Sequence, residues 1–109
     1  MSKLDFIRMD TNIFNNHKIR VIRKAPGGAT LIVIWFKLLA LAGREFPDGE
    51  FITNGKGITD EMLATILDEH ELTVSDALRT FTELGMLDWR DGVYTIRNWK
   101  KWQSPEAPF

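Results

Sequence analysis

The sequence predicts a mainly α fold with a small β-hairpin, arranged as a winged helix-turn-helix. Two short helical patterns, at residues 59–67 and 73–85, follow each other after a brief link, which is typical of a helix-turn-helix. A hairpin signal, Asp91-Gly92 between two β-favouring stretches, comes directly after them. A long apolar helical pattern precedes all three, as expected for the helix on which such a domain packs.

The first helix is predicted at residues 14–25. Its apolar arc, at about 100° per residue, consists of Phe14, Ile19, Val21, Ile22 and Ala25. Arg20, Arg23 and Lys24 fall on the opposite side. Lys18 lies within the apolar arc, where its stem can pack while its ammonium reaches water. The preceding residues 5–9 fit either a short strand or an extended arm.

The second helix is predicted at residues 29–42, after the break at Pro26-Gly27-Gly28. It is apolar almost all round, with Lys37 as its one charge, so it belongs in the middle of a core or in a subunit interface. Gly43 and Pro47-Asp48-Gly49 end it and open a turn. A short strand at 50–53 and a glycine-containing loop at 54–57 are expected next.

The second half has clearer boundary signals. Thr59 is a good N-cap, and the apolar face of its helix consists of Met62, Leu63, Ile66 and Leu67. Thr73 is expected to cap the next helix and Gly85 to stop it. The hairpin strands are predicted at 86–90 and 93–97. One domain therefore covers residues 1–103, and residues 104–109 are interpreted as a C-terminal tail or the start of a linker.

Composition narrows the class of protein. The 109 residues suffice for one compact domain, and the absence of cysteine excludes disulfides and a Cys-based zinc site. No apolar run approaches the roughly 20 residues of a membrane span, and the N-terminus lacks a secretory signal. We therefore expect a cytoplasmic protein that does not contact membranes.

The net charge of −1 conceals a strong segregation of charge. Residues 1–24 carry a net +4, residues 44–91 a net −8, and residues 92–109 a net +2. Because phosphate binding depends on local potential, the two basic ends are candidate contacts for nucleic acid. Uneven surface charge of no functional meaning is the alternative.

Several stretches resemble a known family. They are Phe14–Ile19, Ile34–Leu39, Thr59–Thr65, Ala77–Leu87 and Ile96–Trp99, and the similarity runs over most of residues 6–103. Together they resemble the N-terminal domain of phage replisome organisers, a winged helix similar to DnaD-like primosome proteins. The resemblance implies a role in initiating phage DNA replication in the cytoplasm of a bacterial host, by binding DNA or recruiting helicase-loading proteins. It supplies no set of DNA contacts, and relatives usually carry a further C-terminal region.

The candidate DNA contacts come from the charges. They are Lys18, Arg20, Arg23, Lys24, Arg79, Arg90, Arg97, Lys100 and Lys101. Arg79 is the one basic group on the helix expected to enter a major groove, so we expect phosphate contact mainly from the flanks. Trp89, Trp99 and Trp102 lie among the C-terminal cations and could stack on exposed bases, or Trp99 and Trp102 could pack their segment onto the core.

The apolar second helix suggests a different contact. Trp35, Phe36 and Leu39 are candidates for self-association into a homo-oligomer, unless the first helix covers them.

Catalysis is not expected: His17 and His70 have no spaced metal-ligand partners, and Asn54–Gly57 lacks the glycine spacing of a phosphate loop. No cofactor or metal is expected. The favoured function is a DNA-binding replication module; the alternatives are a self-associating scaffold without DNA contact and a winged-helix transcriptional regulator.

Overall fold

The computed structural model describes residues 2–103 of the 109-residue chain. Within them the elements follow in the order η1 (Ile13–Asn15), α1 (His17–Lys24), α2 (Gly28–Glu45), β1 (Ile52–Thr53), β2 (Lys56–Gly57), α3 (Asp60–Leu67), α4 (Glu71–Glu83), β3 (Leu87–Arg90), β4 (Val93–Ile96) and α5 (Trp99–Gln103). The fold is mainly α with two small antiparallel strand pairs, β1–β2 and β3–β4. The mainly α class and the hairpin β3–β4 were predicted, whereas the pair β1–β2 was not.

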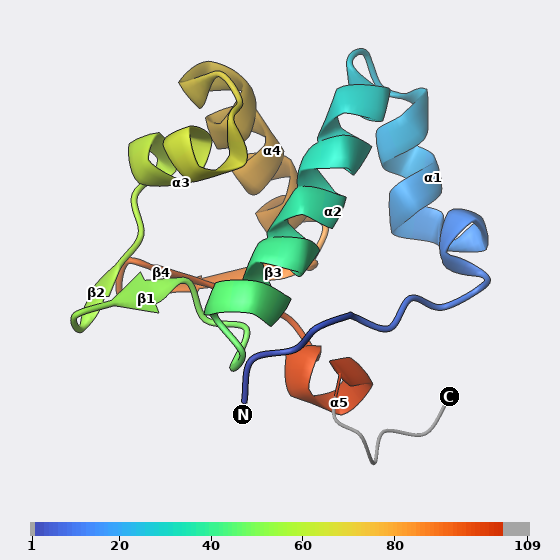
Figure 1. The fold of residues 1–109 in the computed structure, drawn as a ribbon. Helices are drawn as coiled ribbons and strands as arrows, with labels where there is room; N and C mark the ends of the chain where they lie inside the picture. The colour runs from blue at the N-terminus through green and yellow to red at the C-terminus, as the bar shows by residue number, and fades with distance from the viewer. Residues whose placement is uncertain (1, 104–109) are drawn as a thin grey trace.

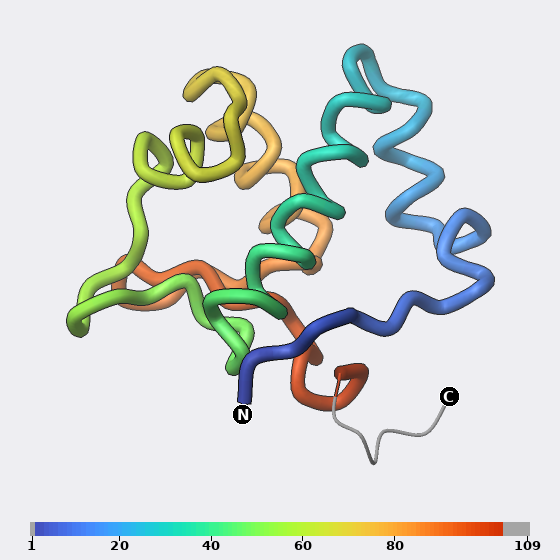
Figure 2. The backbone as a smooth tube through the Cα atoms, viewed as in Figure 1, coloured from blue at the N-terminus to red at the C-terminus, as the bar shows by residue number. Residues whose placement is uncertain are grey.

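Helix α2 is the centre of the fold. It has α1 on one side and α3 and α4 on the other, while the strands and α5 lie toward its C-terminal end (Figure 1). The N-terminal segment crosses that end, where Leu4 N donates to Gly43 O at 2.8 Å (Figure 2). This central place explains why α2 is apolar almost all round. Lys37, the charge in the middle of α2, donates to Leu67 O at 2.8 Å and pairs with Glu69 at 2.7 Å, so the ammonium caps the end of α3.

Helix α1 begins three residues later than predicted. The Asn16 side chain accepts from the backbone N–H groups of Lys18 and Ile19, which fixes the start at His17. Ile19 and Ile22 are buried, whereas Phe14 is 48% exposed and Val21 is 41% exposed. The predicted apolar arc was therefore too broad, because an eight-residue helix on one side of α2 buries only a narrow stripe.

Helices α3 and α4 occupy the predicted helix-turn-helix positions. The Thr59 hydroxyl accepts from Met62 N at 3.1 Å, so the predicted N-cap is confirmed. The prediction that Thr73 caps the next helix was wrong: α4 starts at Glu71 with His70 as N-cap, because the link between the helices is only three residues long. Met62 and Ile66, predicted to face the core, are 43% and 45% exposed.

Two tight hairpins form the β structure. Asp91 and Gly92 both have positive φ (52° and 78°), as the predicted two-residue hairpin turn requires. Asn54 and Gly55 have positive φ as well (52° and 76°), so the expected loop at 54–57 is a second hairpin. A bridge between residues 50 and 95 joins the segment before β1 to β4, an arrangement compatible with a winged helix.

Helix α5 was not predicted. Trp99 is 3% exposed and its indole Nε1 donates to Pro47 O at 2.9 Å, so this side chain packs the segment onto the core. Gln103 is buried and exchanges two hydrogen bonds with the backbone of Arg8, at 2.7 and 2.9 Å. The N-terminal segment around Arg8 has no regular secondary structure, which settles the open choice in favour of an extended arm. The predicted tail at 104–109 lies outside the described residues.

Candidate nucleic-acid interface

The four cations of α1 separate onto two sides of the helix. Arg20, Arg23 and Lys24 line one shallow hollow together with Phe14, and all four are exposed. Lys18 is half-buried and faces the other way, toward the turn between α4 and β3. The four cations that are neighbours in the sequence therefore form, in the folded structure, one group of three and one separate lysine.

Lys18 meets Arg97 over Gly85. A Cβ atom placed on Gly85 would lie 3.5 Å from the Lys18 ammonium nitrogen and 2.7 Å from Nη1 of Arg97. Gly85 has φ +74°, the left-handed conformation that ends α4 and leaves this space for the two side chains. The fold therefore brings one cation from each basic end of the chain to the same backbone turn.

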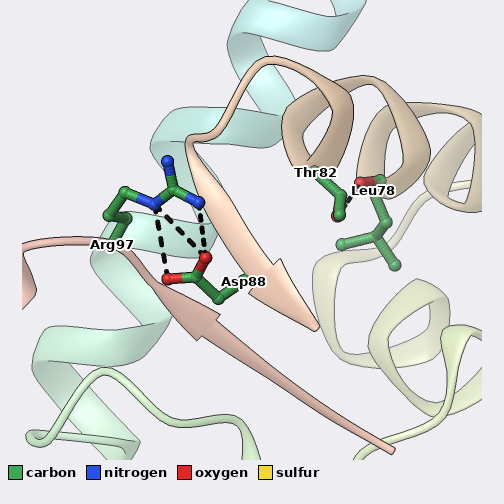
Figure 3. A network of polar contacts seen from close by, with 4 residues as sticks. All are labelled: Leu78, Thr82, Asp88 and Arg97. Carbon is green, nitrogen blue, oxygen red and sulfur yellow. Dashed lines mark hydrogen bonds and ion pairs between the residues drawn. The ribbon is translucent and has the colours of Figure 1, made fainter. Parts of the chain in front are cut away.

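Arg97 is held in place by Asp88 on the neighbouring strand. Its Nη2 donates to Oδ1 of Asp88 at 2.6 Å and its Nε donates to the same carboxylate at 3.2 Å (Figure 3). This hydrogen bonding lowers the pKa of Asp88 and raises the pKa of Arg97. The pair orients the guanidinium, and Nη1 is left toward Gly85 and Lys18.

Helix α4 presents a surface without surplus positive charge. Its exposed stripe consists of Leu72, Asp76, Arg79 and Glu83. Arg79 is paired with Asp76 on the same helix, so its charge is offset where DNA would approach. A depression between α3 and α4 is lined by Glu61, Asp68, Glu69 and Glu71, on the side of α2 away from α1 (Figure 1). Phosphate is repelled there.

The wing and α5 carry the remaining predicted contacts. Arg90 is exposed at the end of β3, and Trp89 beside it is 52% exposed with its ring centroid 4.4 Å from that of Tyr94. Lys100 and Lys101 are exposed on α5, and the Lys101 ammonium lies 5.0 Å from the centroid of the Trp102 ring. These cations lie at the surface but are not part of the convergence at Gly85.

The candidate self-association residues of α2 lie in different environments. Trp35 is 7% exposed and packs edge-on against Phe81 with ring centroids 5.1 Å apart. That contact removes Trp35 from the surface available to a second copy. Phe36 and Leu39 are half-buried and line a hollow of about 230 Å³ between α2, α5 and the N-terminal segment. We call it the aromatic hollow, because the rings of Trp35, Phe36, Trp99 and Trp102 form much of its wall.

Sequence reasoning missed the aromatic hollow and the contribution of Arg8 to its wall. All four of its rings had been noted separately, but residues 35 and 102 become neighbours only through the tertiary fold. No pattern in the sequence pointed to Arg8. The buried Gln103, which ties α5 to the N-terminal segment, was equally inconspicuous.

Within residues 2–103, no three His, Asp or Glu side chains come together as metal ligands would, and no helix is long and apolar enough to cross a membrane. Residues 6–108 match the family model described as the N-terminal phage replisome organiser. Neither a curated protein nor a solved structure matches the chain.

Proposed function

Because the chain belongs to the N-terminal phage replisome organiser family, we propose that it initiates phage DNA replication by contacting DNA phosphates through α1 and the segment after β4. Membership ties the chain to phage replication. The observation that carries the proposed DNA contact is the meeting of Lys18 and Arg97 over Gly85.

Two cations at one backbone turn favour phosphate. Lysine contributes a point charge and arginine a planar fork, and either alone is a common phosphate contact. Their mutual repulsion is relieved when an anion lies between them, since each then gains an opposite charge. Asp88 offsets part of the Arg97 charge, so the phosphate competes with this carboxylate for the guanidinium.

The test is the salt dependence of DNA affinity. We expect Lys18→Gln and Arg97→Gln each to weaken binding and to reduce the slope of log K against log salt by about 1, and the double variant by about 2. Asp88→Asn should strengthen binding, because Arg97 loses its competing carboxylate. Arg44→Gln, which removes an exposed cation paired with Glu45 at 3.7 Å, is the control and should leave the slope unchanged.

Helix α4 is expected to contribute less to DNA affinity than the residues at Gly85. Arg79→Gln should change affinity less than Arg97→Gln, because Arg79 is already paired with Asp76 on an otherwise acidic stripe. No association with single- or double-stranded DNA at low salt would refute DNA binding by this chain. An effect of Arg44→Gln as large as that of Lys18→Gln would refute the site.

A second proposed role is protein contact in replisome assembly, with a second copy or a helicase-loading protein as partner. It is supported by Met62 and Ile66, which are exposed one turn apart on α3, on the side of the fold away from the basic helix α1. Ile66→Glu should abolish any concentration-dependent association in sedimentation while leaving DNA affinity unchanged. A dimer that survives this substitution would refute the surface.

We further propose that the chain acts by binding alone, without catalysis. Assays of nuclease activity and of nucleotide hydrolysis with the purified chain test this proposal.

A further inference from the structure

We infer that the aromatic hollow takes up one unstacked base of single-stranded DNA, so that the strand is held by a base as well as by its phosphates. The inference rests on the proposed function and deepens it by naming the kind of DNA. It follows from the shape and chemistry of the hollow and from the cations around it.

The hollow has the size for one small planar group. Its volume of about 230 Å³ is several times the roughly 30 Å³ of a water molecule and below the range of about 300–1,000 Å³ typical of sites for larger ligands. Its wall comes from three separate parts of the chain: the N-terminal segment, α2, and the residues from Ile96 to Gln103. Two hydrogen bonds join the Gln103 side chain to the Arg8 backbone and hold the first and last of these parts together.

Four of the residues that line the hollow are aromatic. Trp35 and Trp99 are buried and fixed, the former against Phe81 and the latter by its bond to Pro47 O. Phe36 is half-buried, and Trp102 is 38% exposed at the outer side. A base has a π-face whatever its identity, so stacking on such rings binds single strands without strong sequence preference.

The charges distinguish a nucleotide from an apolar side chain of a protein. Arg97 is part of the wall, Lys18 lies beside it over Gly85, and the Lys101 ammonium lies over the Trp102 ring. A base entering the hollow carries a phosphate on each side, and these cations are placed to meet them. Among the described residues, the wall also contains one carboxylate, Asp10, whose Oδ1 accepts from Asn12 N at 2.8 Å. An apolar side chain of a partner protein would gain nothing from the cations.

The experiment compares two single-stranded probes of equal length on the whole chain: an oligothymidylate and an abasic strand with the same phosphates. We expect the oligothymidylate to bind about tenfold more tightly, a modest value for one stacked base. Trp102→Ala should bring the ratio of the two dissociation constants close to one, whereas Trp102→Phe, which retains a ring, should preserve most of it. Phe6→Ala is the control, because Phe6 is an exposed aromatic side chain (79%) that does not line the hollow, and it should leave the ratio unchanged.

A second variant guards against a local folding defect in Trp102→Ala. Leu39→Trp leaves all four rings in place and fills the hollow from α2, so it too should bring the ratio close to one. Equal, salt-sensitive binding of both probes by the unmodified chain would overturn this inference and leave the proposed function standing. Absence of binding to either probe would overturn both. A dimer in sedimentation that Trp102→Ala dissociates would show that the hollow seats a second copy, and it too would overturn the inference.

Discussion

The contact between Gly28 and the end of α1 makes the fold sensitive to one added methyl group. A Cβ atom at Gly28 would lie 2.0 Å from Ile22 O and 3.0 Å from two backbone atoms of Arg23. Real Cβ contacts essentially never fall below 3.0 Å, so Gly28→Ala forces α1 and α2 apart by about 1 Å at this point. The obstructing atoms are backbone and cannot rotate away, and Ile19 and Ile22 are the side chains that would lose packing.

Overpacking of this kind costs about 1–3 kcal/mol. Alanine recovers at most about 1 kcal/mol of helix propensity over glycine, and less at the first residue of a helix. We therefore expect Gly28→Ala to lower the free energy of unfolding by about 2 kcal/mol and Tm by roughly 10 °C. Circular dichroism during thermal and urea denaturation measures both quantities.

The adjacent glycine supplies the control for this prediction. Gly27 has φ +72° and nothing within 4 Å of its Cβ position, so Gly27→Asn, a residue that tolerates the left-handed conformation, should cost little. A Gly28→Ala variant as stable as the unmodified chain would refute the close approach of the two helices. So would equal losses of stability in the two variants, because backbone conformation would then explain both.

Three further predictions concern the wing, the single tyrosine and the end of α3. Gly57→Ala should loosen the wing and lower the free energy of unfolding by about 1–3 kcal/mol, because the added Cβ would lie 1.8 Å from Gly92 O. At Gly55 an added Cβ has nothing within 4 Å, and the cost of Gly55→Ala comes only from the positive φ of that residue. Hydrogen exchange of the β4 amides should therefore rise in Gly57→Ala alone. Burial, followed by a nearby carboxylate, raises the pKa of Tyr94 above 10.0. The stability that this side chain contributes is therefore complete below that pH and is lost as the pH rises through the higher folded pKa. Because Tyr94 is the only tyrosine, tyrosinate absorbance titrates it directly, and a midpoint at or below 10.0 would contradict the burial. Lys37→Met should lower the free energy of unfolding in urea by about 1–2 kcal/mol, because Leu67 O loses its donor. Lys37→Arg should retain part of that stability. A Lys37→Met variant as stable as the unmodified chain would show that the cap is unimportant.

Local sequence signals predicted much of the secondary structure. Pro26-Gly27 separates α1 from α2, which begins at Gly28, Thr59 caps α3, and Asp91-Gly92 turns the wing. In each case a residue type has a conformation or hydrogen bond that few others provide. The missed Asn54-Gly55 hairpin carries the same kind of signal, but its strands have only two residues each and are too short to show an alternating pattern.

Element ends were predicted poorly where tertiary contacts decide them. Helix α4 begins two residues before the predicted cap Thr73, although His70 makes no side-chain capping bond. Helix α5 follows a positive φ at Asn98 and has five residues, too few to be stable alone. Its side chains Trp99 and Gln103 find partners at Pro47 and Arg8, which are remote in the sequence.

The candidate site, like the secondary structure, was predicted in part from the sequence and in part depends on tertiary contacts. The presence of cations at both ends of the chain was evident from composition, but the meeting of Lys18 with Arg97 depends on where α4 ends. Gly85 was predicted as the stop of that helix from its residue type. That its missing side chain makes room for two cations follows only from the packing of α1 and β4 around the turn.

The all-round apolar character of α2 shows how one sequence pattern can have two structural causes. A single small core seemed unable to cover Trp35, Phe36 and Leu39 at once, so the sequence left two explanations open: cover by the first helix and cover by a second copy of the chain. The structure instead surrounds α2 with α1, α3, α4 and the N-terminal segment, so that Trp35 lies in the core and the other two lie at the aromatic hollow. Among the large apolar side chains of α2, Val33 at 51% is the exposed one, and a lone residue of this kind is too small a surface to hold two copies together. Val33 therefore does not supply a surface for self-association, and Met62 and Ile66 on α3 are among the large apolar side chains that are exposed elsewhere on the fold.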